Sequence, residues 1–173
     1  MESTRQVICL LKLAGSLLLI CAGALAGCME SHKLLLRVEK LEAFLRFLSS
    51  ARAEIRYSSM PAEALLRNHS EGICFFSHVT GGNSGTSFAD SWNSAVAEYA
   101  ACEGFGKKDM ELLRGFGAGL GATDTEGQVA HFRLYENLTS SALDEAKEEH
   151  RRKAKLYKML GLFGGTAAAI LLC

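Results

Sequence analysis

The chain has 173 residues, in which 19 lysines and arginines balance 19 aspartates and glutamates. Because these charges cancel, no general basic field exists to hold a nucleic-acid backbone. The six cysteines are scattered without a Cys-x-x-Cys pair, which argues against a zinc site and against a disulfide framework. A single proline and long stretches of Leu, Ala, Glu, Lys and Arg predict an all-α protein.

The first predicted element is an apolar N-terminal segment, residues 7–29, with one charged residue, Lys12. A helix needs about 20 apolar residues to cross a bilayer, so this segment is long enough if Lys12 extends toward the head groups. Gly23 and Gly27 are one turn apart, a spacing that allows two membrane helices to approach closely. We therefore predict an N-terminal transmembrane helix here.

An alternative interpretation starts from Leu25-Ala26-Gly27-Cys28, which has the form of a bacterial lipoprotein cleavage box. In that case Cys28 is lipidated, and the following domain is exported and binds its target outside the membrane. The charge at Lys12 and the basic residues after Cys28 argue against this interpretation. It remains the alternative from a different functional class.

Residues 30–155 form the predicted helical domain. Its first helix continues from the apolar segment to about Tyr57, because Leu and Val recur at spacings of three and four residues. Four shorter helices are expected over Pro61 to about Asn68, Ile73–Val79, Ser87 to about Cys102, and Asp109–Leu120. Thr123-x-x-Glu126 fits a capping box for the last long helix, which starts at about Asp124.

The last predicted element is a second apolar segment, residues 156–173, which we interpret as a C-terminal transmembrane helix. Gly161 and Gly165 repeat the one-turn spacing of small residues. Basic residues flank both apolar segments on the side of the middle domain. The first flank contains Lys33, Arg37, Lys40 and Arg46, and the second contains Lys147, Arg151, Arg152, Lys153, Lys155 and Lys158. Because lysine and arginine are retained on the cytoplasmic side, the middle domain is expected in the cytoplasm.

The resulting architecture is an antiparallel helical bundle. One long helix leaves the membrane and the other returns to it, so the two must lie side by side, with the short helices folded at the membrane-distal end. No catalytic constellation is present in the sequence. There is no phosphate-binding loop and no His-Glu-x-x-His motif, and the alternating glycines from Gly117 to Gly121 follow a helix and not a strand. We therefore expect a protein that is not an enzyme and that binds no cofactor. A membrane-bound enzyme is the least favoured interpretation.

Three motifs carry a resemblance to a known family. The first is Glu54-Ile55-Arg56-Tyr57 followed by Pro61. The second is Leu113-x-x-Phe116-Gly117-x-x-Leu120-Gly121-x-x-Asp124, followed by Gln128 and His131. The third is Tyr157-Lys158-x-x-Gly161. In this order and spacing they resemble the stage III sporulation protein AB family, over nearly the whole chain. The departure is a long N-terminal lead-in before Leu10.

The resemblance implies a function. Members of this family belong to the mother-cell channel complex of endospore-forming bacteria and resemble the inner-membrane platform proteins of type II secretion and type IV pilus systems. It implies a non-enzymatic scaffold in the mother-cell membrane facing the forespore. It also implies contacts with a cytoplasmic secretion-type ATPase and with other stage III channel proteins, and leaves homo-oligomerisation open.

Two groups of residues are candidates for partner contact or for internal packing. Glu54, Arg56 and Tyr57 end the first long helix, where an ion pair with the last helix competes with a partner contact. The second group is Phe116, Gly117, Gly121 and Asp124. Here packing is the preferred interpretation: the glycines permit close approach and a left-handed helix end, and Asp124 caps the last helix.

Overall fold

The computed structural model describes residues 2–58, 62–68, 72–80 and 87–172. Within these ranges it leaves the side chains of residues 2–14, 16, 19, 58, 62–63, 158, 168–169 and 171–172 undescribed. Every regular element in the described ranges is helical, which confirms the all-α prediction. The chain divides into two compact units, residues 1–35 with 148–173 and residues 36–147. The domain boundaries predicted from the sequence, at residues 7–29, 30–155 and 156–173, stay a prediction.

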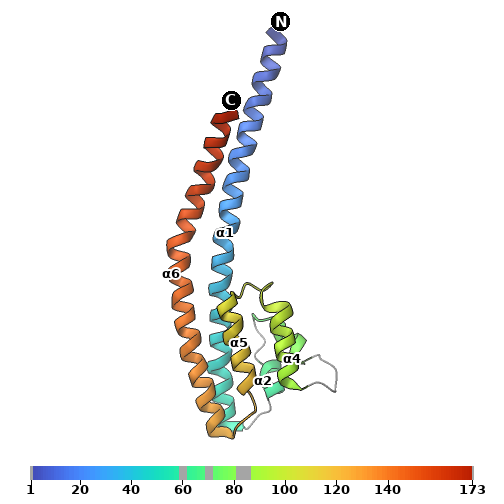
Figure 1. Ribbon diagram of the computed structural model, residues 1–173, viewed down its shortest axis with the longest axis vertical. Helices are drawn as coiled ribbons and strands as arrows, with labels where there is room; N and C mark the ends of the chain where they lie inside the picture. Colours follow the sequence, from blue (N-terminus) through green and yellow to red (C-terminus); the bar gives the residue numbers. More distant parts are fainter. Residues whose placement is uncertain (1, 59–61, 69–71, 81–86, 173) are drawn as a thin grey trace. The chain divides into compact units, whose positions relative to one another are not determined.

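The described residues form two long helices and five short elements (Figure 1). They are α1 (Glu2–Ser58), α2 (Ala62–Asn68), α3 (Phe75–Thr80), α4 (Phe88–Ala95), the π-helical turn η1 (Val96–Ala100), α5 (Lys107–Gly119) and α6 (Thr125–Leu172). Each lies close to its predicted position. The helix expected from Ser87 to about Cys102 is the main exception, because α4 changes into a π-helical turn at Val96.

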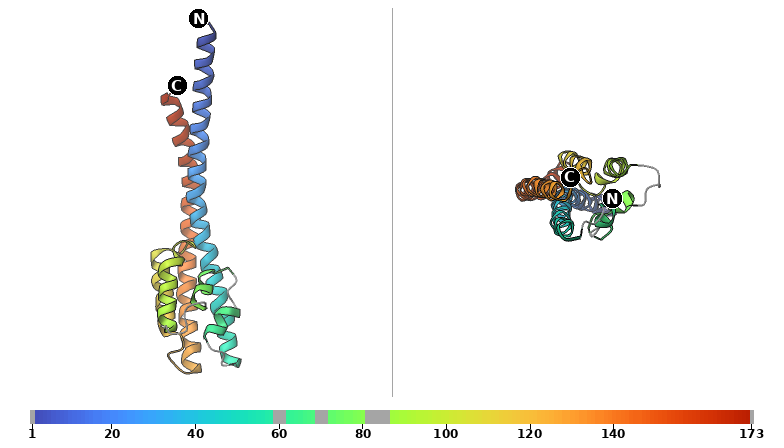
Figure 2. Two further views of the ribbon diagram at one scale, coloured as in Figure 1. Left: turned by 90° about the vertical axis from the view of Figure 1, so that its right-hand side faces the viewer. Right: turned by 90° about the horizontal axis from the view of Figure 1, so that it is seen from below.

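In the second unit, α1 and α6 lie side by side, as both Figure 1 and Figure 2 show. Their ion pairs define the direction: Lys147 pairs with Glu42 and Arg52 pairs with Glu136, so a higher number on one helix meets a lower number on the other. The two helices are therefore antiparallel in this unit, as predicted. The buried face of α1 follows helical spacing, with Leu41, Phe44, Leu48, Ala51 and Ile55.

The core of the second unit is rich in aromatic rings. Trp92, Phe75, Phe76, Phe116 and Phe132 have no exposed surface. Phe75 and Phe76 contact the Trp92 ring with centroids 5.6 and 5.7 Å apart, within the range in which aromatic pairs attract one another. Phe105, at 4 % exposure, also belongs to this core.

The first unit contains the N-terminal part of α1 and the C-terminal part of α6. A Cβ atom built on Gly23 would lie 2.5 Å from the carbonyl oxygen of Gly161 and 3.1 Å from Cα of Gly165. One built on Gly27 would collide with the carbonyl oxygen of Tyr157. The two backbones therefore meet at a distance that only glycine permits, and the register shows that the pair is antiparallel.

The structure gives no support to the predicted terminal transmembrane helices. Over the residues it describes, no helix has a stretch both long and apolar enough to cross a bilayer. Parts of both predicted spans fall on side chains outside that description, namely residues 7–14, 16 and 19 in the first and residues 158, 168–169 and 171–173 in the second.

Candidate functional site

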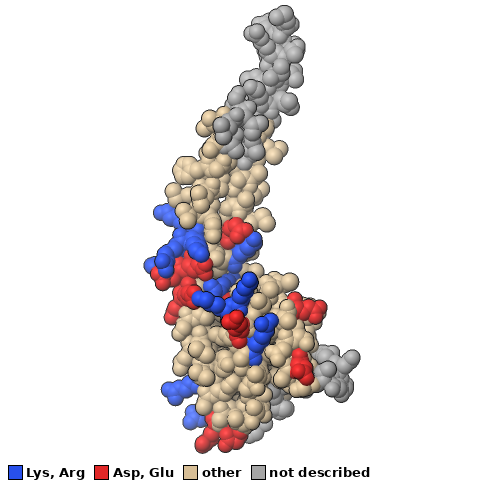
Figure 3. Space-filling model, in the orientation of Figure 1, with Lys and Arg blue, Asp and Glu red and all other residues tan. Residues whose placement is uncertain are grey.

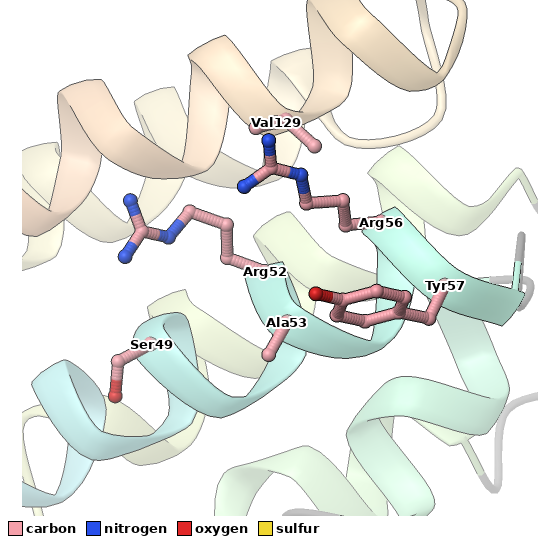
Figure 4. A pocket seen from close by; sticks show the side chains of 6 residues that line it. All are labelled: Ser49, Arg52, Ala53, Arg56, Tyr57 and Val129. Atoms are coloured by element: carbon pink, nitrogen blue, oxygen red, sulfur yellow. The ribbon is translucent and has the colours of Figure 1, made fainter.

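One face at the end of α1 forms an open groove in the second unit. Ser49, Arg52, Ala53, Arg56 and Tyr57 recur at three- and four-residue spacing, so they lie on the same side of the helix. Val129 of α6 forms the opposite wall, and the groove has a volume of about 230 Å³. Figure 4 shows the two arginine side chains reaching toward α6, with the Tyr57 ring beside them.

The groove carries two positive charges and one nearby counter-charge. The Nε atom of Arg52 lies 3.1 Å from Oε1 of Glu136, whose side chain is only 14 % exposed. Arg56 is exposed and forms no ion pair with any residue in the described part of the chain. Tyr57 is 86 % exposed, the most exposed large hydrophobic side chain among those described in the second unit. Arg56 and Tyr57, predicted together, thus meet in one open site.

Glu54, the third member of that predicted group, lies elsewhere. It is half-buried and does not line the groove. Arg56 is the second residue after Glu54 along α1, a spacing that turns the two side chains to different faces of a helix. The structure therefore places Glu54 outside the groove that Arg56 and Tyr57 line.

The second predicted group lies at the α5–α6 connection, and its first two members are internal. The fully buried ring of Phe116 contacts the rings of Phe44, Trp92 and Phe132 at centroid distances of 5.5, 5.5 and 5.0 Å. A Cβ atom on Gly117 would overlap the Trp92 indole, whose Nε1 donates a hydrogen bond of 2.7 Å to the carbonyl of Leu113. In this fold Phe116 and Gly117 face the core.

The turn between α5 and α6 is organised by Gln128. Its buried amide nitrogen donates to the carbonyl of Gly119 and to Oγ1 of Thr123, both at 3.0 Å. Its amide oxygen accepts the N–H of Gly121 at 3.1 Å. Gly121 has φ of +79°, a backbone conformation that costs an ordinary L-residue about 1–2 kcal/mol. One side chain therefore binds two backbone groups and one hydroxyl of the turn that follows α5.

Asp124 is the cap of α6. Its Oδ1 accepts the backbone N–H of Gly127, three residues on, at 3.0 Å. The predicted Thr123-x-x-Glu126 capping box is wrong, because Thr123 is one residue too early and its hydroxyl accepts from Gln128 instead. An aspartate at this position also stabilises the positive end of the helix dipole.

Replacing Asp124 with alanine should lower the free energy of unfolding by about 1 kcal/mol, the usual cost of losing a side-chain cap. Urea unfolding of the full-length chain, followed by the fluorescence of its single tryptophan, Trp92, measures this change. Asp144→Ala is the matched control, since Asp144 is exposed in the interior of α6. Equal effects of the two substitutions would contradict the cap.

Two long-range ion pairs of the second unit were not predicted. Arg37 binds Asp109 through two hydrogen bonds, Nε to Oδ2 at 2.7 Å and Nη2 to Oδ1 at 2.9 Å. Lys40 lies 3.1 Å from Glu103, whose carboxylate also accepts the N–H groups of Cys74 and Phe75 at the start of α3. Both cations had been assigned only to the basic flank of the first predicted span.

A sequence signal existed for one end of the Arg37–Asp109 contact. Asp109 follows Gly106 by three residues, the spacing of a residue that accepts the N–H at the helix start, and its Oδ2 does so at 2.8 Å. The partner cations are 63 and 72 residues away in the chain. A spacing rule cannot find pairs at that separation.

The described part of the molecule contains no metal site, and the face in Figure 3 carries charges of both signs. No three His, Cys, Asp or Glu side chains among the described residues lie close enough together to hold a metal ion. On the face shown in Figure 3, Lys and Arg are interspersed with Asp and Glu. The aromatic cluster around Phe116 holds one titratable phenol, Tyr135, and burial raises its pKa.

Comparison with known proteins identifies the family. The family model for stage III sporulation protein AB matches residues 12–173. The chain belongs to the stage III sporulation protein AB family. Neither the curated proteins nor the solved structures that were compared contain a match.

The structure gives the residues of the second motif physical roles. Phe116 and Gly117 fill the core, Gly121 makes the left-handed turn, Asp124 caps α6 and Gln128 binds the turn. Nε2 of His131, the last residue of that motif, lies 2.9 Å from the carbonyl oxygen of Phe116. This stage III sporulation protein AB motif builds the corner between α5 and α6, whereas the first motif places Arg56 and Tyr57 in the open groove.

Proposed function

We propose that the protein is a non-enzymatic platform of a sporulation-specific, secretion-like channel complex. In this proposal it is anchored in the mother-cell membrane facing the forespore and holds a cytoplasmic secretion-type ATPase against membrane components of the channel. Membership of the stage III sporulation protein AB family supports the role in sporulation. The further steps, from sporulation to platform and ATPase, rest on the resemblance of that family to secretion platform proteins.

The observation that carries the platform role is the exposure of Arg56 and Tyr57. The candidate residues of the second motif are used in packing, capping or turn formation. Arg56 and Tyr57 instead lie on the surface beside an open groove. Tyrosine and arginine are enriched among the residues that dominate the binding energy of protein interfaces. A scaffold needs such a surface and needs no reactive group.

Membrane anchoring is supported by the sequence alone. Two apolar segments with basic flanks on the middle-domain side favour a cytoplasmic position for residues 30–155. The glycines at 23, 27 and 161 allow close backbone contact between the two segments, a form of packing that suits membrane helices.

Thiol labelling in intact sporulating cells tests this topology. Cys74 and Cys102 are free and exposed, so a membrane-impermeant maleimide can react with both in the folded protein. We expect no labelling in intact cells and labelling of both after permeabilisation, with peptide mass spectrometry to identify the modified cysteine. A Cys74→Ser/Cys102→Ser variant controls for reaction at other cysteines. Labelling from outside would contradict the platform topology and favour the lipoprotein alternative with Cys28 lipidated.

Co-purification tests the partner. The full-length chain, solubilised in mild detergent, is expected to retain the secretion-type ATPase of the complex. Failure of the purified ATPase to bind the full-length chain, under conditions where the chain is folded by Trp92 fluorescence, would refute this part of the proposal.

A further inference from the structure

The two arginines of the groove form a like-charge pair. Arg52 and Arg56 are four residues apart on α1, a spacing at which equal charges destabilise a helix by a few tenths of a kcal/mol. Only Arg52 has a counter-ion among the described residues, namely Glu136. The groove therefore has a local excess of positive charge.

The helix dipole accounts for part of this arrangement. Arg56 is in the last turn of α1, where a cation interacts favourably with the negative end of the dipole. That effect needs neither an adjacent second arginine nor a tyrosine that is 86 % exposed. The combination of Arg52, Arg56 and Tyr57 around an open volume of about 230 Å³ is left without an internal explanation.

We propose that this groove binds an acidic side chain presented by a partner protein. The guanidinium groups supply paired N–H donors that match the two oxygens of a carboxylate. The Tyr57 ring supplies apolar area next to the pair and a hydroxyl at its edge. Val129 and Ala53 give the groove apolar walls, which weaken the competition from water for the charge pair.

The charge pattern favours a protein partner over a nucleic acid. Binding of a phosphate backbone depends on many cations that follow the chain of phosphates. The protein has no net charge, and the face in Figure 3 shows both signs interspersed. Two arginines in one groove fit a single carboxylate and offer no path for a polyanion.

The inference deepens the proposed function and rests on it, because it describes how a platform would hold its partner. A photo-crosslinking amino acid at Ser49 tests it in sporulating cells that express the full-length chain. Ser49 is exposed at the edge of the groove, so this replacement leaves Arg52, Arg56 and Tyr57 in place. Mass spectrometry of the crosslinked peptide then identifies the partner segment.

We expect a crosslink to a peptide of another protein that contains Asp or Glu at the contact. Arg56→Glu should lower its yield roughly tenfold or more, as expected for loss of a dominant interface residue. Arg114→Glu is the matched control, because Arg114 is exposed on α5 away from the groove, and it should leave the yield unchanged. Changing the identified partner carboxylate to arginine should restore crosslinking to the Arg56→Glu variant.

The outcomes separate the two proposals. A crosslink to an acidic segment of the ATPase supports both. A crosslink to an acidic segment of another protein supports the groove, and co-purification then decides the ATPase separately. A crosslink to lipid, nucleic acid or a segment without acidic residues, no crosslink at all, or equal effects of Arg56→Glu and Arg114→Glu would overturn the groove as an acidic-partner site. Binding of the ATPase in that case would leave the proposed function standing.

Discussion

Replacing Asp109 with asparagine is expected to lower the free energy of unfolding by about 3 kcal/mol, the lower end of the range for breaking a buried ion pair. The Asp109 side chain is 1 % exposed, and Arg37 is 14 % exposed. Asparagine keeps the size of the side chain but removes its charge and one of its acceptors. The guanidinium of Arg37 would then remain mostly buried after losing the negative charge of Asp109, which is the main source of the cost.

Urea unfolding of the full-length chain reports this loss through Trp92 fluorescence, as a lower midpoint with an unchanged slope. Glu145→Gln is the matched control, because it neutralises an acid in the exposed Lys108–Glu145 pair. An exposed pair of this kind contributes about 0–1 kcal/mol. The double variant Arg37→Met/Asp109→Leu should recover part of the stability, since it removes both charges. A loss at Asp109 no larger than at Glu145 would show that the ion pair is not structurally important.

The helices of this protein were predictable because their signals are local. The apolar spacing of α1 and the glycines after α5 involve residues within a few positions of one another. The predicted ends agree closely with the observed ones: about Tyr57 against Ser58, and Leu120 against Gly119. The antiparallel order of the two long helices followed from the chain having to return to the side from which it came.

The contacts that fix the second unit were not predictable, because they join distant parts of the chain. Lys40 and Arg37 looked like members of a basic flank, and nothing near them indicates Glu103 or Asp109 as partners. The π-helical turn η1 was also missed. A π-helical turn places one extra residue in the helix, and the spacing of apolar residues does not locate that residue.

The candidate site was predictable in part. The sequence placed Arg56 and Tyr57 at a helix end, where a partner contact and an ion pair were both open. The structure shows the groove and its second arginine, Arg52, which the resemblance motif does not contain. Arg52 could have been found from its position one turn before Arg56. The wall formed by Val129 could not, because it comes from α6.

Replacing Phe116 with alanine is expected to cost about 3–5 kcal/mol of the free energy of unfolding, the usual range for removing a buried aromatic ring. Phe116 has no exposed surface, and its ring lies within 6.1 Å, between centroids, of Phe44, Phe47, Trp92, His131, Phe132 and Tyr135. These contacts join α1, α4, α5 and α6. Alanine would leave a cavity where the four helices meet.

This substitution also decides between packing and docking for the Phe116–Gly117 corner. Packing predicts a large loss of stability with Phe116→Ala and a smaller loss with Phe116→Leu, which retains more of the buried volume. Leu134→Ala is the control, because Leu134 is 53 % exposed and its loss should change stability by about 0.5 kcal/mol or less. Urea unfolding monitored by circular dichroism is the suitable measurement, since Phe116 contacts Trp92 and the substitution would itself alter the fluorescence. A Phe116→Ala chain of nearly unchanged stability that no longer binds its partner would contradict packing and make this corner a contact surface, because a ring that stabilises four helices cannot be removed without destabilising them.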